Sequence, residues 1–157
     1  REMERFGMQV EHPGELANIS WFGKGPHETM LDRQCSGVVA RHNLTIDRFP
    51  HNYMYPQENG NRTDVRWFTL TDERGRGLLI KDAGGTLLYF SAWPYTAEDL
   101  NQAAHIHELP RRENITLNID YRQKGAGGDT PGLLVLHDEF KLKKGELYRY
   151  SFTLQGI

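Results

Sequence analysis

The sequence predicts an all-β fold built from antiparallel strands, with at most one short helix. Short segments that alternate apolar and polar residues recur along the 157 residues, and turn signals such as Asn-Gly and Gly-Pro separate them. Aromatic residues make up 11% of the chain while hydrophobic residues reach only 38%, as in many sheet proteins with a polar face. Short strands with regular turn signals favour an antiparallel sandwich or a barrel-like sheet.

The expected strands are segments in which successive side chains point to opposite faces. In chain order they are residues 6–10, 17–22, 62–70, 77–81, 87–93, 115–121, 133–142 and 147–154. The clearest alternation is in 115–121, where Ile115, Leu117 and Ile119 share one face. We expect the last two strands to form a closing hairpin around residues 143–146.

One short helix is expected over residues 96–104. Thr96 can cap its N-terminus, and Glu98 and Asp99 in the first turn complement the helix dipole. Pro94 ends the strand that precedes it.

Composition limits the kind of protein and its partners. This length suits one domain spanning residues 1–157. The 19 basic and 21 acidic side chains give a formal net charge of −2, without the basic cluster that would indicate nucleic-acid binding. No apolar run approaches the roughly 18 residues of a membrane span. Arg1 is not an initiator residue and no signal-peptide pattern follows it, so we expect a fragment of a longer chain.

Cys35 is the only cysteine in the chain. An internal disulfide and a zinc cluster of thiolates are therefore excluded. No nucleophile signature surrounds Cys35, so we do not expect it to be catalytic.

Residues 55–67 carry a dense polar pattern that allows two interpretations. Asn59-Gly60 is a strong turn signal, and the following charged residues alternate with Thr63, Val65 and Trp67. The polar row consists of Glu58, Asn59, Arg62, Asp64 and Arg66. It could bind a ligand rich in hydroxyl groups, or it could be a solvated sheet face with internal ion pairs, which is the more common case.

Two further groups of residues suggest chemistry. His105 and His107 would point the same way on a strand, where they could contact a sugar, act as acid and base, or hold a metal if a third ligand were near. Residues 125–132 form a glycine-rich loop that lacks the features of a phosphate-binding motif. Asp129 in this loop could accept hydrogen bonds from vicinal hydroxyls, or it could simply cap its own turn.

Taken in order, these pieces resemble the C-terminal (fifth, small-chain) domain of bacterial β-galactosidases in glycoside hydrolase family 2. The resemblance covers nearly the whole chain and rests on two specific motifs, Trp-x-Gly-x-Gly-Pro and Pro-x-Glu-Asn-Gly. The matching segments are residues 21–28, Asp32-Arg33, 55–60, Arg62, 65–67, His105, His107, 117–120, 125–129 and 148–152.

The resemblance implies a large antiparallel β-sandwich, the supersandwich similar to galactose mutarotase. It also implies that a separate barrel of about 250 residues carries the catalytic pair, two glutamates about 5 Å apart in a retaining enzyme. We therefore expect no catalytic residue, no metal and no cofactor in this chain.

The small-chain domain of this family lends a loop to the rim of the active site, which implies substrate contacts from Gly127, Gly128, Asp129 and Thr130. Lower-ranked candidates for substrate contact are Glu58, Asn59, Arg62, His105 and His107. The family usually has a tryptophan where this chain has Gly132, so the stacking surface of that residue is missing here.

Two alternatives stay open beside the accessory role. The chain could be a stand-alone mutarotase-like epimerase, with His105 or His107 and Glu58 or Asp129 as acid and base. It could also be a carbohydrate-binding module. The resemblance implies a β-galactoside-like carbohydrate and the other domains of the parent chain as partners. It leaves open a homo-oligomeric parent and either the bacterial cytoplasm or the periplasm.

Overall fold

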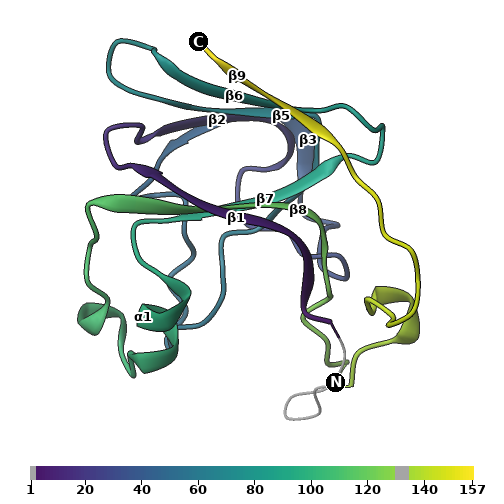
Figure 1. Ribbon diagram of the computed structural model, residues 1–157. Coiled ribbons are helices and arrows are strands. Elements are labelled where there is room, and N and C mark those ends of the chain that lie inside the picture. Colours follow the sequence, from purple (N-terminus) through teal and green to yellow (C-terminus); the bar gives the residue numbers. More distant parts are fainter. Residues whose placement is uncertain (1–2, 130–134) are drawn as a thin grey trace.

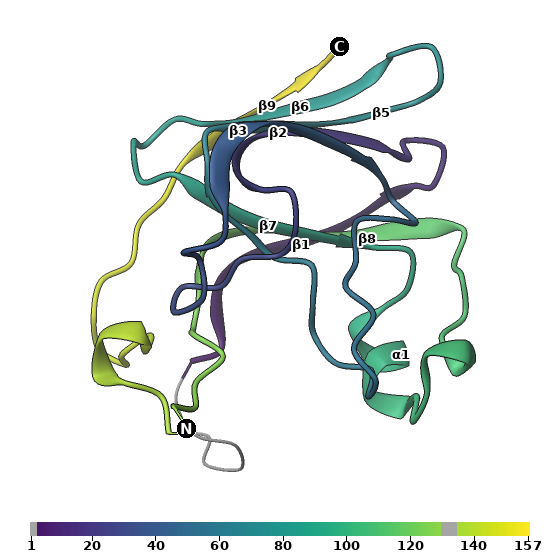
Figure 2. The same ribbon diagram turned by 180° about the vertical axis from the view of Figure 1, so that it is seen from behind.

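The computed structural model, which describes residues 3–129 and 135–157, is a sandwich of two antiparallel sheets. Figure 1 shows the five-stranded sheet above the four-stranded sheet, with α1 and the long loops below, and Figure 2 shows the same layers from behind. The predicted all-β sandwich is therefore confirmed. Across the described residues, no helix is long and apolar enough to cross a membrane.

The order of strands within each sheet differs from their order along the chain. The four-stranded sheet runs β1 (Arg5–Pro13), β8 (Asn114–Gln123), β7 (Leu88–Trp93), β4 (Arg62–Val65). The five-stranded sheet runs β3 (Val38–Thr45), β2 (Asn18–Gly25), β5 (Trp67–Thr71), β6 (Gly77–Asp82), β9 (Phe152–Gly156). The helical turns are α1 (Ala97–Gln102), η1 (Ile106–Glu108) and η2 (Asp138–Phe140).

The core lies between the two sheets. Ile115, Leu117 and Ile119 of β8 are buried in it, as the alternation in 115–121 predicts. Phe68 of β5 and Phe90 of β7 stack across the layer with ring centroids 4.1 Å apart. This apolar layer supplies most of the driving force for folding, because removal of apolar surface from water is the dominant favourable term.

The predicted strand over residues 62–70 is wrong, because the chain changes sheets within it. β4 pairs with β7 in one sheet, and β5 pairs with β2 in the other. The change follows Asp64, whose φ of 54° lies in the left-handed region that Asp tolerates better than most residues. The predicted charged face is therefore broken: Arg62 is buried in the core, and Asp64 pairs with Lys24 at 3.0 Å.

The predicted closing hairpin is also wrong within the described residues. From 135 to 151 the chain forms η2 and loops, apart from an isolated bridge between Met3 and Leu142. Only β9 is a strand, and it adds to the edge of β6. The apolar residues of this segment alternate as those of a strand would. Tyr150 nevertheless packs against the core from a loop, and Phe152 packs against it from the start of β9.

The helix is confirmed, with a shorter range than predicted. Thr96 caps α1, and a capping box links Thr96 with Asp99. Arg112 donates to both carboxylate oxygens of Asp99, at 3.0 and 2.5 Å, and these bonds hold the pKa of Asp99 well below its usual range. The strand β3 was not predicted, although Val38-Val39 was a usable β signal.

Candidate functional site

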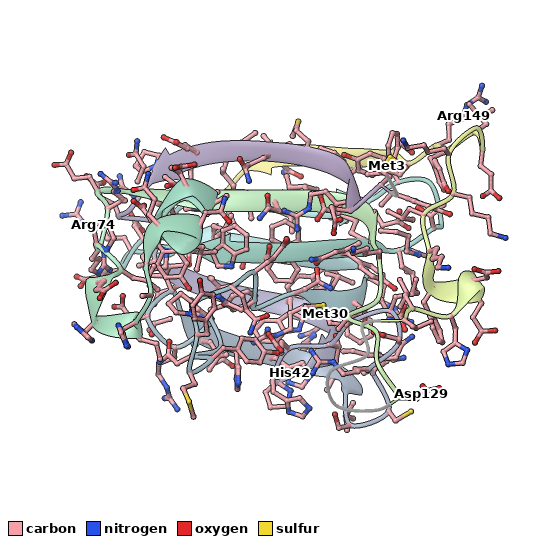
Figure 3. All side chains as sticks on the ribbon, turned by 90° about the horizontal axis from the view of Figure 1, so that it is seen from below. Met3, Met30, His42, Arg74, Asp129 and Arg149 are labelled. Atoms are coloured by element: carbon pink, nitrogen blue, oxygen red, sulfur yellow. The ribbon has the colours of Figure 1, made fainter. Side chains whose placement is uncertain are left out.

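Three pockets adjoin at one end of the sandwich, and Arg33 lines all of them. Their volumes are about 220, 220 and 360 Å³. The lining comes from residues 27–36, 51–58, 123–129 and 136–140, together with Glu4. We call this region the loop end. Figure 3 shows Asp129 at this end and Arg74, in the β5–β6 turn, at the opposite end.

A further pocket of about 380 Å³ lies beside α1. Thr96 and Arg112 line it, and the side chains of both are hydrogen-bonded to Asp99. It brings together none of the residues predicted to contact substrate.

The glycine-rich loop, which the structure describes over residues 125–129, contains three of the four predicted rim residues. Gly127 and Gly128 have φ of 81° and 87°, which glycine adopts without strain. The amides of Ala126 and Gly127 donate to the two carboxylate oxygens of Asp32, at 2.9 and 2.7 Å. Gly127, Gly128 and Asp129 line one pocket, so the structure brings these predicted residues together. Thr130 and Gly132 lie outside the described residues.

Asp129 has a partner within the same pocket. Its Oδ2 lies 2.9 Å from Nε2 of His137. The Asp129 carboxylate raises the pKa of His137, through the hydrogen bond first and the charge second. Both side chains are exposed, so the pair is open to solvent and to a ligand.

The second loop of the site, residues 53–60, is fixed by side chains of residues 28–33. The Tyr53 hydroxyl donates to Glu28 Oε1, and the amide of Gly60 donates to Glu28 Oε2 at 2.8 Å. Arg33 donates to the Tyr53 hydroxyl at 3.2 Å and pairs with Glu28 at 3.6 Å.

Glu58 belongs to a charged cluster at the base of this loop. Arg5 donates to Glu58 and lies 3.2 Å from Oδ2 of Asp120. Burial raises the pKa of Glu58, which Arg5 opposes. Burial also raises the pKa of Asp120, to about 7. Arg5 therefore pairs with two carboxylates. Of these two, Glu58 lines a pocket.

Two of the lower-ranked candidates are buried. Asn59 is 3% exposed and bonds the amide of His51 and the hydroxyl of Tyr95. Arg62 is 1% exposed, and its guanidinium carbon lies 4.2 Å from the ring centroid of Phe49. Burial lowers the pKa of Arg62 to about 9. Both side chains bind the protein itself, so this geometry gives no support to substrate contact by either.

His105 and His107 do not lie on a strand. His105 precedes the turn η1 and His107 lies within it, so the strand geometry predicted for them is wrong. Their rings still stack, with centroids 5.4 Å apart, and His105 pairs with Glu108 at 3.1 Å. This turn follows α1, on the opposite side of the molecule from the segment 135–150 (Figures 1 and 2). The structure therefore does not bring these histidines together with Asp129.

The side chains that organise the loop end were not predicted to do so, although three of them lie in segments that carry the family resemblance. They are Glu28, Asp32, Arg33 and Tyr53, and each acts on a segment distant in the sequence. The signal available was the acidic and basic content of residues 28–33, next to a Gly-Pro turn. Among the described residues, no group of three or more His, Cys, Asp or Glu side chains could hold a metal.

Comparison with known proteins places this chain in a family. Residues 1–154 match the family model described as beta galactosidase small chain. The chain is 34% identical to a beta-galactosidase of Priestia megaterium over 99% of its length, and that match covers 15% of the relative. It is 35% identical to beta-galactosidase BgaC of Bifidobacterium adolescentis over 87% of its length, or 13% of the relative. It is 33% identical to a beta-galactosidase of Vibrio cholerae over 98% of its length, and that match covers 14% of the relative.

The matches extend over most of this chain but only a small part of each relative. The chain spans 13–15% of the length of these three relatives. It belongs to the β-galactosidase small-chain family.

Proposed function

We propose that this chain is a non-catalytic domain of a β-galactosidase-type glycoside hydrolase, and that its loop end completes the rim of the active site. The observation that carries the proposal is the group of three adjoining pockets around Arg33, which includes the glycine-rich loop. The relatives are named beta-galactosidases and are far longer than this chain. In this proposal the chain is one domain of a longer protein, whose other domains carry the catalytic pair and face the loop end.

The chemistry of the loop end suits a carbohydrate. Asp129 and His137 offer a carboxylate and an imidazole on an open pocket wall, and glycine lets the backbone approach a ligand closely. Glu58, Gln57 and Tyr53 add polar groups to the neighbouring pocket. Hydroxyl groups of a β-galactoside could pair with such groups, and Glu58 is the strongest of the lower-ranked candidates. The rim role requires binding from these residues and no bond cleavage.

Replacement of Asp129 in the full-length protein tests the proposal. We expect Asp129→Ala to lower kcat/KM for β-galactoside hydrolysis by roughly tenfold, as for the loss of one hydrogen bond to a charged group. The effect should vary with the leaving group if the loop lies on that side of the site. Glu73→Ala, which removes an exposed carboxylate in the β5–β6 turn, is the matched control and should leave kinetics unchanged. Unchanged kinetics in Asp129→Ala would remove the loop from the active site.

A mutarotase-like epimerase is the second candidate, and one observation favours it. Glu58 lines a pocket, and burial raises its pKa, as is useful in an acid or a base. Neither of its predicted histidine partners lines the pocket of Glu58, which weakens the candidate. Anomer exchange of galactose by the chain alone, faster than in buffer, would favour it over the rim role. Galactose binding without exchange would instead favour a carbohydrate-binding module.

A further inference from the structure

A single short segment supports both loops of the candidate site. This support segment, residues 28–33, carries Asp32 toward the glycine-rich loop and Glu28 toward the loop 53–60. It is itself fixed by paired backbone hydrogen bonds between Met30 and Arg33, both of 3.0 Å. The relative position of the two loops therefore depends on this segment.

The contact between Asp32 and the glycine-rich loop is close and two-pronged. Each carboxylate oxygen accepts one backbone amide, at 2.9 and 2.7 Å. A Cβ atom added to Gly125 would lie 2.6 Å from Cγ of Asp32 and 2.8 Å from Cδ1 of Leu136. Real Cβ atoms do not approach other atoms so closely, so an alanine at this position would displace the carboxylate or the loop. The carboxylate and the glycine fit as a pair.

The contact is also long-range. Asp32 and Ala126 are 94 residues apart in the sequence. A carboxylate that accepts backbone amides makes charge-assisted hydrogen bonds, which are roughly twice as strong as neutral ones. These two bonds fix the backbone just before Gly128 and Asp129, the residues that reach the pocket.

We infer that Asp32 is a positioning residue, which sets the glycine-rich loop, and with it Asp129, relative to the loop 53–60. This inference rests on the proposed rim function. Asp32 itself binds the loop backbone with both oxygens, so it acts on a substrate through the loop.

Asp72 offers a matched control for a purely structural effect. Its Oδ1 accepts the amides of Arg74 and Arg76, at 2.8 and 2.9 Å, in the β5–β6 turn. It therefore performs the same backbone-holding task at the end of the molecule opposite to Asp129, as the position of Arg74 shows (Figure 3). Asp72 Oδ2 also accepts a hydrogen bond from the Arg76 guanidinium at 2.9 Å, so Asp72→Asn removes a charge-assisted contact within that turn. Only loss of the Asp32 carboxylate should disturb the site.

The experiment compares Asp32→Asn with Asp72→Asn in the full-length protein. Asparagine keeps the shape but presents an NH₂ group to one of the two amides, so one bond is lost. We expect amide exchange of Ala126 and Gly127 to accelerate by roughly tenfold or more, the equivalent of one charge-assisted hydrogen bond. We also expect KM for a β-galactoside to rise by more than kcat falls. Asp72→Asn should change neither the exchange of these two amides nor KM.

Gly125→Ala is a second variant that disturbs the same contact from the loop side. We expect it to give the same exchange and KM signature, so a poorly folded Asp32 variant would still leave the inference testable. The inference is overturned if the loop amides and KM respond no more to Asp32→Asn and Gly125→Ala than to Asp72→Asn.

Asp129→Ala separates failure of the inference from failure of the proposed function. If Asp129→Ala changes kinetics while the Asp32 and Gly125 variants do not, the rim role stands and the positioning role fails. If the Asp32 variant frees the loop amides but neither it nor Asp129→Ala changes kinetics, the proposed function fails, and the positioning role for catalysis fails with it.

Discussion

The two faces of β8 in the four-stranded sheet are buried to a similar degree but by different chemistry. The core face carries Ile115, Leu117 and Ile119 from β8, all at most 1% exposed. The opposite face, which lies over the loops in Figure 1, carries Asn118 and Asp120 from the same strand, both 0% exposed. Alternate residues of one strand therefore enter an apolar layer and a polar layer.

The polar layer is connected by hydrogen bonds. Gln9 donates to Asn118 at 2.8 Å, and Asn118 donates to Ser91 at 2.9 Å, which links three adjacent strands. Buried polar groups are costly unless they are paired, so this layer contributes specificity rather than driving force. The difference teaches that the core face holds the sandwich together, while the polar face connects to the loop 53–60 through Arg5, which pairs with both Asp120 and Glu58.

Neighbouring residues of β7 offer the sharpest test of this comparison. Phe90 faces the core and contacts Phe68, Trp21 and Phe49, whereas Ser91 faces the polar layer. We expect Phe90→Ala to lower the free energy of unfolding by about 3–5 kcal/mol, through lost burial and a cavity. Ser91→Ala should cost only about 1 kcal/mol, because one hydrogen bond to Asn118 is lost. Denaturant titration measures both, and equal losses would break the comparison.

Asp120 should make stability depend on pH, because its pKa is raised by burial to about 7 from an ordinary value of 3.8. Between these values the folded protein holds a proton that the unfolded chain releases, so this group's contribution to stability falls as pH rises from about 4 to 7. Asp120→Asn removes that dependence. The free energy of unfolding of the variant, minus that of the unmodified protein, should therefore increase from pH 4 to pH 8. The increase should be about 1.4 kcal/mol for each unit by which the pKa of Asp120 is raised.

Thermal or denaturant unfolding of both proteins across this pH range measures the effect. A parallel pH dependence in the two proteins would contradict a buried Asp120 with a raised pKa.

Patterns that act locally could be predicted from the sequence. The alternation of β8 and the Thr96 cap of α1 are decided by neighbouring residues, and both were predicted. The change of sheet near Arg66 could not be, because residues 62–70 alternate as one strand would and only pairing with β7 and β2 separates them. The hairpin predicted for the C-terminal segment failed for the same reason, since β9 pairs with β6 instead.

In the candidate site, too, the features that depend on local sequence could be predicted, and those that depend on long-range contacts could not. The Gly-Gly-Asp segment is visible in the sequence as a loop with an exposed acid, and the resemblance gave it a role. The supporting contacts of Asp32 and Glu28 join residues 94 and 32 positions apart, and no local pattern encodes such a pairing. The burial of Arg62 was also hidden, since alternation predicts a face but not what covers it.

Hydrogen exchange of the full-length protein, with and without a non-hydrolysable thio-β-galactoside, tests the central claim most directly. Residues 123–129 lie at the loop end, and residues 72–76 form the β5–β6 turn at the opposite end (Figure 3). If the loop end faces the active site, saturating ligand should slow exchange in 123–129 and leave 72–76 unchanged. The rim role would be contradicted if the exchange rate of 123–129 were unchanged by the ligand, as that of 72–76 is, at a concentration that fully inhibits hydrolysis.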